Sequence, residues 1–305
     1  MSATKDDVRR LTVSDIGRMY ADGERIPMLT AYDYPTARIL DDAGIPMILV
    51  GDSLGQVALG YESTVRVTMD EMLHHTRAVV RGTKRALVIG DMPFLSYATA
   101  DEAIDNAGRF LQDGGAQAVK IEGGVRSARM VEALVKAGVP VMGHIGWTPQ
   151  SQHGLGGKVK VQGKTRSAAR AMLSDAIAIQ EAGAFSIVLE LVPEQLAAVI
   201  TSRLRIPTIG ICAGPHCSGQ VQVVPDLLGL GDFHPKHARA YADLQGTIAE
   251  ATRAWMADVT AGTFPGAAET VRMDEAVLEE VLGRHVDDRA GTTDALAGIP
   301  LDRDL

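Results

Sequence analysis

One local pattern recurs along this chain: a helix-forming stretch, a turn that contains glycine, and then a short apolar run rich in β-branched residues. Four clear copies have their apolar runs at residues 47–50, 118–121, 140–142 and 185–189. Glycine after a helix supplies the left-handed conformation that ends it, and an uninterrupted apolar run is typical of a strand buried on both faces. Repeats of helix, turn and buried strand therefore predict parallel βαβ units.

Eight strands are predicted, with helices in the gaps between them. The predicted strands span residues 27–33, 47–52, 86–91, 118–122, 140–145, 185–191, 207–213 and 220–224. The predicted helices span residues 68–85, 100–113, 127–137, 167–182 and 194–203, and the first of them opens with a capping box formed by Thr68 and Glu71. Eight strands in this alternation favour an α/β fold of the (β/α)₈ barrel type. A doubly wound open sheet is the alternative, although no G-x-G-x-x-G follows the first strand.

The pattern changes after the last predicted strand. Residues 1–234 are expected to form the barrel with an N-terminal lead-in. Residues 235–285 are expected to form a C-terminal helical appendage of the same domain, with helices at 237–259 and 273–284. The polar segment 286–305 is predicted to be a mobile tail.

Charge and composition exclude several classes of partner. Thirty basic and 38 acidic side chains give a formal net charge of −8, which provides no general attraction to nucleic acid or anionic lipid. The apolar runs are too short to span a bilayer, and the first ten residues lack an apolar signal core, so a cytoplasmic location is expected. The two cysteines, Cys212 and Cys217, are predicted to be reduced thiols, although their spacing also permits a disulfide or a metal pair.

Three acidic residues stand at the ends of adjacent predicted strands: Asp52, Asp91 and Glu122. Neighbouring strands lie about 4.8 Å apart, so carboxylates converging there repel one another unless a cation joins them. Oxygen ligands suit a hard ion, and Mg²⁺ keeps positions open for water or substrate. The alternative is that each acid only caps the helix that follows it. The set of three favours a metal site at the carboxyl ends of the strands, which is the catalytic face of such barrels.

Three further ionisable residues belong to the same predicted strand ends. Lys120 points to the same face as Glu122, and it is expected to neutralise a substrate carboxylate, to form a Schiff base, or simply to form a salt bridge. His144 is a candidate metal ligand, acid–base group or orienting residue, and the sequence does not choose between these roles. Glu190 ends an otherwise apolar strand, where a carboxylate is costly unless it is paired or solvated, so a proton-transfer role is favoured.

Several segments resemble the ketopantoate hydroxymethyltransferase family. The matching segments are Met28-Leu29-Thr30-Ala31-Tyr32-Asp33, Val50-Gly51-Asp52-Ser53-Leu54-Gly55, Gly90-Asp91-Met92-Pro93-Phe94, Val119-Lys120-Ile121-Glu122-Gly123-Gly124, Gly143-His144-Ile145-Gly146-Trp147-Thr148-Pro149-Gln150-Ser151, Val161-Gln162-Gly163 and Leu189-Glu190. The resemblance runs from about residue 12 to residue 265, and it implies a barrel of the phosphoenolpyruvate-binding type assembled as a homodecamer, a pentamer of dimers. It also implies transfer of a hydroxymethyl group from 5,10-methylenetetrahydrofolate to the 2-oxo acid 3-methyl-2-oxobutanoate, which is a step of pantothenate synthesis.

The resemblance implies roles for individual residues as well. Asp52, Asp91 and Glu122 match positions that hold Mg²⁺. Asp52, Ser53, Asp91 and Lys120 match positions that bind the 2-oxo acid. Glu190 matches the proton acceptor, and His144 matches a position near the substrate.

The sequence departs from the family pattern in two loops, at residues 158–161 and 212–218, and these departures bear on folate contacts more than on the reaction. The first belongs to the glycine-rich basic segment 154–164, interpreted either as a lid over an anionic ligand or as a solvated loop. Two rival functions remain at this point. One is a metal-dependent aldolase or lyase that acts on another 2-oxo acid, and the other is a non-catalytic barrel.

Overall fold

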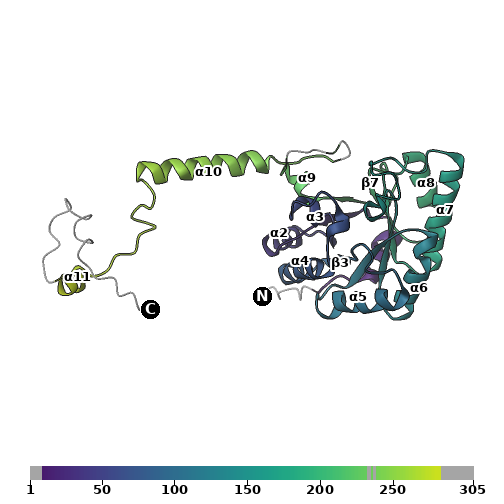
Figure 1. The fold of residues 1–305 in the computed structure, drawn as a ribbon, viewed down its shortest axis with the longest axis horizontal. Helices are drawn as coiled ribbons and strands as arrows, with labels where there is room; N and C mark the ends of the chain where they lie inside the picture. The colour runs from purple at the N-terminus through teal and green to yellow at the C-terminus, as the bar shows by residue number, and fades with distance from the viewer. Residues whose placement is uncertain (1–8, 232–234, 236–237, 283–305) are drawn as a thin grey trace, which may run out of the picture. The chain divides into compact units, whose positions relative to one another are not determined.

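The computed structural model describes residues 9–231, 235 and 238–282. Eight parallel strands close into a barrel in chain order, and the last strand pairs with the first (Figure 1). The strands are β1 Ile26–Thr30, β2 Met47–Val50, β3 Leu87–Asp91, β4 Ala118–Glu122, β5 Val141–Gly146, β6 Ser186–Glu190, β7 Thr208–Ile211 and β8 Gly219–Gln222. Closure confirms the (β/α)₈ prediction and excludes the open sheet.

Helices surround the strands (Figure 1). In the barrel they are α1 Val13–Ala21, α2 Tyr34–Asp42, α3 Leu54–Val57, α4 Met69–Gly82, α5 Ala100–Gln112, α6 Ala128–Lys136, α7 Arg166–Glu181, α8 Glu194–Arg203 and α9 Val224–Leu228, with short 3₁₀ turns η1 Thr64–Arg66, η2 Val125–Ser127 and η3 Pro149–Ser151. The predicted capping box is present at the start of α4, where the Thr68 and Glu71 side chains each accept from the other residue's backbone N–H. The short link between β7 and β8 contains no helix, and all of its residues are described.

Apolar side chains fill the barrel interior and close its amino-terminal end. Ile16 of α1 packs in one buried cluster with Ile26 and Met47, which begin the first two strands. A second, larger cluster fills the space between the strands and the surrounding helices. Helix α1 forms where the sequence predicted only a lead-in. With one end sealed by α1, the charged strand ends lie at the opposite, carboxyl-terminal mouth.

Five strands, β1, β2, β6, β7 and β8, end one to three residues earlier than predicted. Two of these ends have a clear local cause. β1 ends at Thr30 because Asp33 turns out of the strand and caps α2, accepting a hydrogen bond of 2.8 Å from the backbone N–H of Thr36. β7 ends at Ile211 because Cys212 adopts a positive φ of 53°, which a strand does not allow. Cys212 and Cys217 are both free thiols, as predicted.

The chain divides into two compact units, Met1–Gln245 and Gly246–Leu305. The predicted helix 237–259 is wrong at its start: α10 spans Leu244–Ala261, since the backbone before it is held in a loop in which Tyr241 N–H donates to Leu227 O at 2.8 Å. α11 spans Glu275–Leu282, within the predicted range 273–284. The predicted mobile tail, 286–305, lies outside the described residues, and the domain boundaries drawn from the sequence stay a prediction.

The closing seam of the barrel gives a stability test. An alanine Cβ at residue 219, the first of β8, would lie 2.0 Å from the Ile26 carbonyl oxygen of β1, whereas one at Gly108 in α5 would meet nothing within 4 Å. We expect Gly219→Ala to lower the free energy of unfolding by about 1–3 kcal/mol. Gly108→Ala should raise it by roughly 0.5–1 kcal/mol through helix propensity. Urea unfolding followed by circular dichroism measures both, and wild-type stability in Gly219→Ala would contradict the tight β1–β8 seam.

Candidate active site

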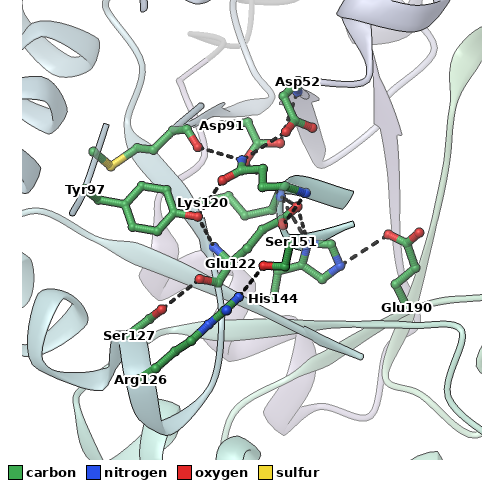
Figure 2. Close-up of polar contacts among 12 residues, drawn as sticks. Asp52, Asp91, Tyr97, Lys120, Glu122, Arg126, Ser127, His144, Ser151 and Glu190 are labelled. Carbon is green, nitrogen blue, oxygen red and sulfur yellow. Dashed lines mark hydrogen bonds and ion pairs between the residues drawn. The ribbon is translucent and has the colours of Figure 1, made fainter. Parts of the chain in front are cut away.

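The ends of five neighbouring strands bring six predicted site residues to one mouth of the barrel (Figure 2). Asp52 follows β2, Asp91 ends β3, Lys120 and Glu122 lie on β4, His144 lies on β5, and Glu190 ends β6. The parallel register makes Asp91 the direct neighbour of Lys120, and Glu122 the neighbour of His144. All of these except Glu190 are buried. The predicted convergence of charged strand ends is therefore present in the structure.

The Lys120 ammonium contacts two of the acidic residues, Asp91 and Glu122. Its Nζ atom lies 2.8 Å from Asp91 Oδ1 and 3.9 Å from Glu122 Oε1. Burial alone would lower the pKa of Lys120, but the three carboxylates of Asp91, Glu122 and Asp52 outweigh it and hold the pKa above its ordinary value. A lysine that attacks a carbonyl must lose its proton, so this environment disfavours the Schiff-base role and favours a fixed positive charge.

The three carboxylates of Asp52, Asp91 and Glu122 carry more negative charge than the single ammonium of Lys120 balances. Burial, and after it the repulsion from Asp91 and Glu122, raises the pKa of Asp52 well above its ordinary value. Burial also raises the pKa of Asp91 in spite of the Lys120 contact. Asp91 Oδ1 lies 2.8 Å from Lys120 Nζ, and Glu122 Oε1 lies 3.3 Å from His144 Nδ1. Each carboxylate oxygen has more than one lone pair, so these contacts leave room for a further positive ligand.

A divalent cation fits the chemistry of these donors, although the donors are not arranged around one in advance. Across residues 9–231, 235 and 238–282, no group of three or more His, Cys, Asp or Glu side chains already forms a metal-ligand set. The Lys120 ammonium instead contacts both Asp91 and Glu122. Buried, mutually repelling carboxylates with open oxygens are nevertheless the donors that Mg²⁺ prefers. The residues present therefore fit the predicted ion by donor type and charge.

His144 links the buried acids to the mouth of the barrel. Its Nδ1 atom lies 3.3 Å from Glu122 Oε1, and its Nε2 atom lies 3.2 Å from Glu190 Oε2 (Figure 2). Burial and Lys120 would lower the pKa of His144, but contacts with Glu122 and Glu190 raise it to about 9. A pKa of about 9 favours the protonated ring at neutral pH. The Glu190 side chain is 21% exposed, so the row from Glu122 through His144 to Glu190 leads from the interior toward solvent.

Ser53 follows Asp52 at the start of α3. Its hydroxyl lies 2.9 Å from the Tyr32 hydroxyl, so one bond to a buried phenol orients it. The backbone N–H of Asp52 donates to Asp91 Oδ2 at 3.1 Å, which ties the ends of β2 and β3 together. Ser53 therefore stands beside the cluster, and its part in substrate binding stays a prediction.

Sequence reasoning assigned no role to two neutral residues that contact the cluster. The Gln150 side chain donates to Asp52 Oδ2 at 2.9 Å, and the Tyr97 hydroxyl donates to Gln150 Oε1 at 2.6 Å. Gln150 lies within the segment that resembles the family, which was the only sequence signal for it. Tyr97 lies in the loop after β3, and nothing in the sequence pattern marks it.

Comparisons with known proteins place the whole barrel in one family. The profile of the ketopantoate hydroxymethyltransferase family matches residues 10–267. The chain belongs to the ketopantoate hydroxymethyltransferase family. A 3-methyl-2-oxobutanoate hydroxymethyltransferase of Chloroflexus aurantiacus is 61% identical over 275 residues, which cover 90% of this chain and 97% of that relative. A 3-methyl-2-oxobutanoate hydroxymethyltransferase of Dehalococcoides mccartyi is 58% identical over 274 residues, which cover 89% of this chain and 97% of that relative.

Solved structures agree on the fold. A phosphoenolpyruvate phosphomutase from Streptomyces platensis subsp. rosaceus superposes with a TM-score of 0.56 at 16% identity, covering 90% of this chain and 96% of that one. The match agrees with the predicted (β/α)₈ barrel. Ketopantoate hydroxymethyltransferases are transferases of pantothenate biosynthesis, so the family match also agrees with the expected enzyme class.

The crowding of carboxylates generates a prediction for the metal-free protein. Because the native pKa of Asp52 is raised, the native state holds this proton more tightly than the unfolded chain. Stability is therefore lost as pH rises above about 4, the ordinary range of a carboxyl group. In EDTA, we expect Asp52→Asn to melt at a higher temperature than wild type, by a margin that grows as pH rises.

Asp70→Asn is the matched control, because Asp70 forms an exposed ion pair with Arg109. We expect Asp70→Asn and wild type to melt at nearly the same temperature at every pH. Differential scanning calorimetry from pH 4 to pH 8 makes the comparison. A constant difference between Asp52→Asn and wild type would contradict the repulsion argument. Asp52→Asn should also respond less to added Mg²⁺ than wild type does.

Proposed function

We propose that this protein transfers a hydroxymethyl group from 5,10-methylenetetrahydrofolate to 3-methyl-2-oxobutanoate, giving ketopantoate and tetrahydrofolate in pantothenate biosynthesis. The observation that carries the proposal is the family match, which spans residues 10–267 and therefore every strand that contributes a site residue. The buried cluster of one lysine and three acids supports it, because a 2-oxo acid needs both a positive charge for its carboxylate and a way to polarise its ketone.

Lys120 is the residue for the substrate carboxylate in this proposal. Its ammonium is buried and keeps its charge, so it stabilises an anion without a competing shell of water. Asp52, Ser53 and Asp91 complete the binding surface for the 2-oxo acid. Asp52, Asp91 and Glu122 would hold Mg²⁺, whose contribution when bound is Lewis-acid polarisation of the 2-oxo group.

Glu190 is the residue that we propose for proton transfer. It is the most exposed of the charged strand-end residues that form the site, so it exchanges protons with solvent while it faces the cluster. Polarisation of the ketone acidifies the C3 proton, and Glu190 accepts that proton. C3 then forms a bond to the methylene carbon as one of its two C–N bonds to the folate breaks. Water cleaves the second C–N bond, which leaves a hydroxymethyl group on C3 and releases tetrahydrofolate. The His144 Nε2 atom, 3.2 Å from Glu190 Oε2, holds the Glu190 carboxyl group facing the cluster. His144 is thus assigned an orienting role.

A pocket of about 570 Å³ is lined by Gly123 and Ile145, which directly follow Glu122 and His144 in the chain, and this position supports a site for the second substrate. Ser151 and Arg126 line it, and the Arg126 guanidinium donates to the Ser151 hydroxyl one residue away from Gln150 (Figure 2). Gln162, at the end of the glycine-rich basic segment 154–164, lines the same pocket. We place the folate donor here, with the basic segment close to the acidic tail of the folate.

We also propose that the protein works as a homo-oligomer, a decamer, in the cytoplasm, with small molecules as its substrates and no nucleic acid or membrane partner. Helix α10 supports assembly, because it contains no buried residue although Ile248, Trp255, Met256 and Val259 are large apolar side chains. Such a surface is usually covered in an assembly. No described helix is long and apolar enough to cross a membrane.

Product analysis tests the reaction. Purified protein with 3-methyl-2-oxobutanoate, 5,10-methylenetetrahydrofolate and Mg²⁺ should form ketopantoate, and EDTA should stop it. Condensation with formaldehyde alone, at the same rate and without folate, would instead favour an aldolase or lyase. No turnover of either mixture by folded protein would contradict the proposal.

Glu190→Gln tests the proton-transfer role. It keeps the shape and polarity of the side chain but cannot accept the proton, so kcat should fall by about a hundredfold to ten-thousandfold. The KM for the 2-oxo acid should change little, because Lys120 and the metal ligands are intact. Steady-state kinetics measures both constants, with Glu194→Gln as the control, since Glu194 begins α8 and pairs with His216 outside the cluster. A Glu190→Gln enzyme with wild-type kcat would remove Glu190 from the mechanism.

A further inference from the structure

Gln150 contacts two of the carboxylates that the proposed metal site requires. Its side-chain Nε2 donates to Asp52 Oδ2 and to the backbone oxygen of Met92, both at 2.9 Å. Its backbone N–H donates to Glu122 Oε2 at 3.1 Å. The residue is only 4% exposed. One buried residue from the turn after β5 therefore connects the acid that follows β2 to the acid that ends β4.

Tyr97 completes the connection from the opposite side. Its hydroxyl donates to Gln150 Oε1 at 2.6 Å and accepts from the backbone N–H of Glu122 at 3.3 Å. The two donors and the acceptor of the Gln150 amide all have partners, and the phenol uses both its proton and a lone pair. The result is a closed network with no unused polar group in these two side chains.

Only one assignment of donors and acceptors satisfies all the hydrogen bonds of Gln150 and Tyr97. The Met92 carbonyl can only accept, so the NH₂ end of the Gln150 amide must face Met92 and Asp52, and the oxygen end then receives the Tyr97 phenol proton. Asp52 Oδ2 is thereby held as an acceptor while its other oxygen, Oδ1, is left to other partners. The same logic applies to Glu122, where Oε2 accepts from the Gln150 backbone N–H and Oε1 faces His144 Nδ1 and Lys120 Nζ.

We propose that Gln150 and Tyr97 are positioning residues that fix one oxygen each of Asp52 and Glu122, and so limit the movement that these two carboxylates need in order to bind one cation. Two carboxylates that repel each other would otherwise turn apart or recruit a proton, and either change weakens a metal site. This inference rests on the proposed metal site. It assigns to a neutral amide and a phenol, neither of which touches the substrate or the ion, the preorganisation on which the binding of that ion depends.

Tyr97→Phe is the sharper of two variants. It removes one oxygen, frees the Gln150 amide to rotate and leaves the Glu122 N–H without its partner. Gln150→Met removes the side-chain bonds at nearly constant volume but keeps the backbone N–H that reaches Glu122. Tyr61→Phe is the matched control, because the Tyr61 hydroxyl donates to Glu71, which caps α4 away from the cluster.

The primary measurement is calorimetric titration of each metal-stripped protein with Mg²⁺ and with Mn²⁺. Loss of groups that orient metal ligands typically weakens binding tenfold to a hundredfold, so the dissociation constants of Tyr97→Phe and Gln150→Met should rise by about that factor. Tyr61→Phe should bind as wild type does. Saturating Mg²⁺ should restore most of kcat in Tyr97→Phe, because the groups that contact the substrate are unchanged.

Melting temperatures with and without Mg²⁺ separate positioning from a structural role. A purely structural network would lower the melting temperature equally in both conditions. A positioning network reduces the rise that Mg²⁺ produces, since a tenfold loss of affinity removes about 1.4 kcal/mol of ligand stabilisation. If Gln150→Met does not fold, Tyr97→Phe alone decides the question.

The outcomes distinguish this inference from the function on which it rests. Weaker ion binding and a smaller Mg²⁺-induced rise in the two variants, with an unchanged Tyr61→Phe, support it. Wild-type affinity in Tyr97→Phe and Gln150→Met overturns it and leaves the proposed metal site intact. A wild-type protein that binds neither ion overturns the metal site and this inference together. A wild type that binds metal but forms no ketopantoate overturns only the proposed reaction.

Discussion

The buried ammonium of Lys120 is the interaction on which the rest of this site depends. Three carboxylates converge on the mouth of a barrel that water hardly reaches, and such groups are stable there only if a positive charge lies among them. Lys120 contacts Asp91 and Glu122 directly, and both acids raise its pKa against the effect of burial. The remaining excess of negative charge creates the demand for a further cation.

The barrel makes this arrangement possible through register and through closure at one end. Parallel pairing sets Asp91 beside Lys120 and Glu122 beside His144, so the cluster follows from which residues end each strand. Helix α1 seals the other end, where Ile16 packs against the first residues of the early strands. The polar groups therefore converge at one mouth, where the Glu190 side chain is partly exposed to solvent.

The sequence predicted the fold and the charged residues because both depend on local signals. Buried strands appear as apolar runs. An acid at the end of such a run, such as Asp91, is costly to bury among apolar side chains, so it is expected at the mouth of the barrel. Gln150 and Tyr97 were not predicted, because neutral polar residues in loops look alike until the fold brings them together. Tyr97 and Gln150 are 53 positions apart, and Gln150 and Asp52 are 98 apart.

Errors at the ends of elements have the same origin. The strand predicted at 207–213 ends early because Cys212 takes a left-handed backbone conformation that only the tertiary fold imposes. Helix α10 begins later than predicted because Tyr241 is bonded to a residue 14 positions earlier in the chain, Leu227. Apolar periodicity carries no information about such bonds, so it locates an element better than it locates the ends of that element.

The most direct test of the account is hydrogen exchange at C3 of 3-methyl-2-oxobutanoate in D₂O, followed by proton NMR. The substrate methyl doublet collapses to a singlet when C3 takes up deuterium, so exchange is read without any product being formed. The account predicts rapid exchange with wild-type protein, Mg²⁺ and tetrahydrofolate, and its loss in EDTA and in Glu190→Gln. No exchange with folded, Mg²⁺-loaded protein, with or without tetrahydrofolate, would contradict the claim that this cluster activates the C3 proton.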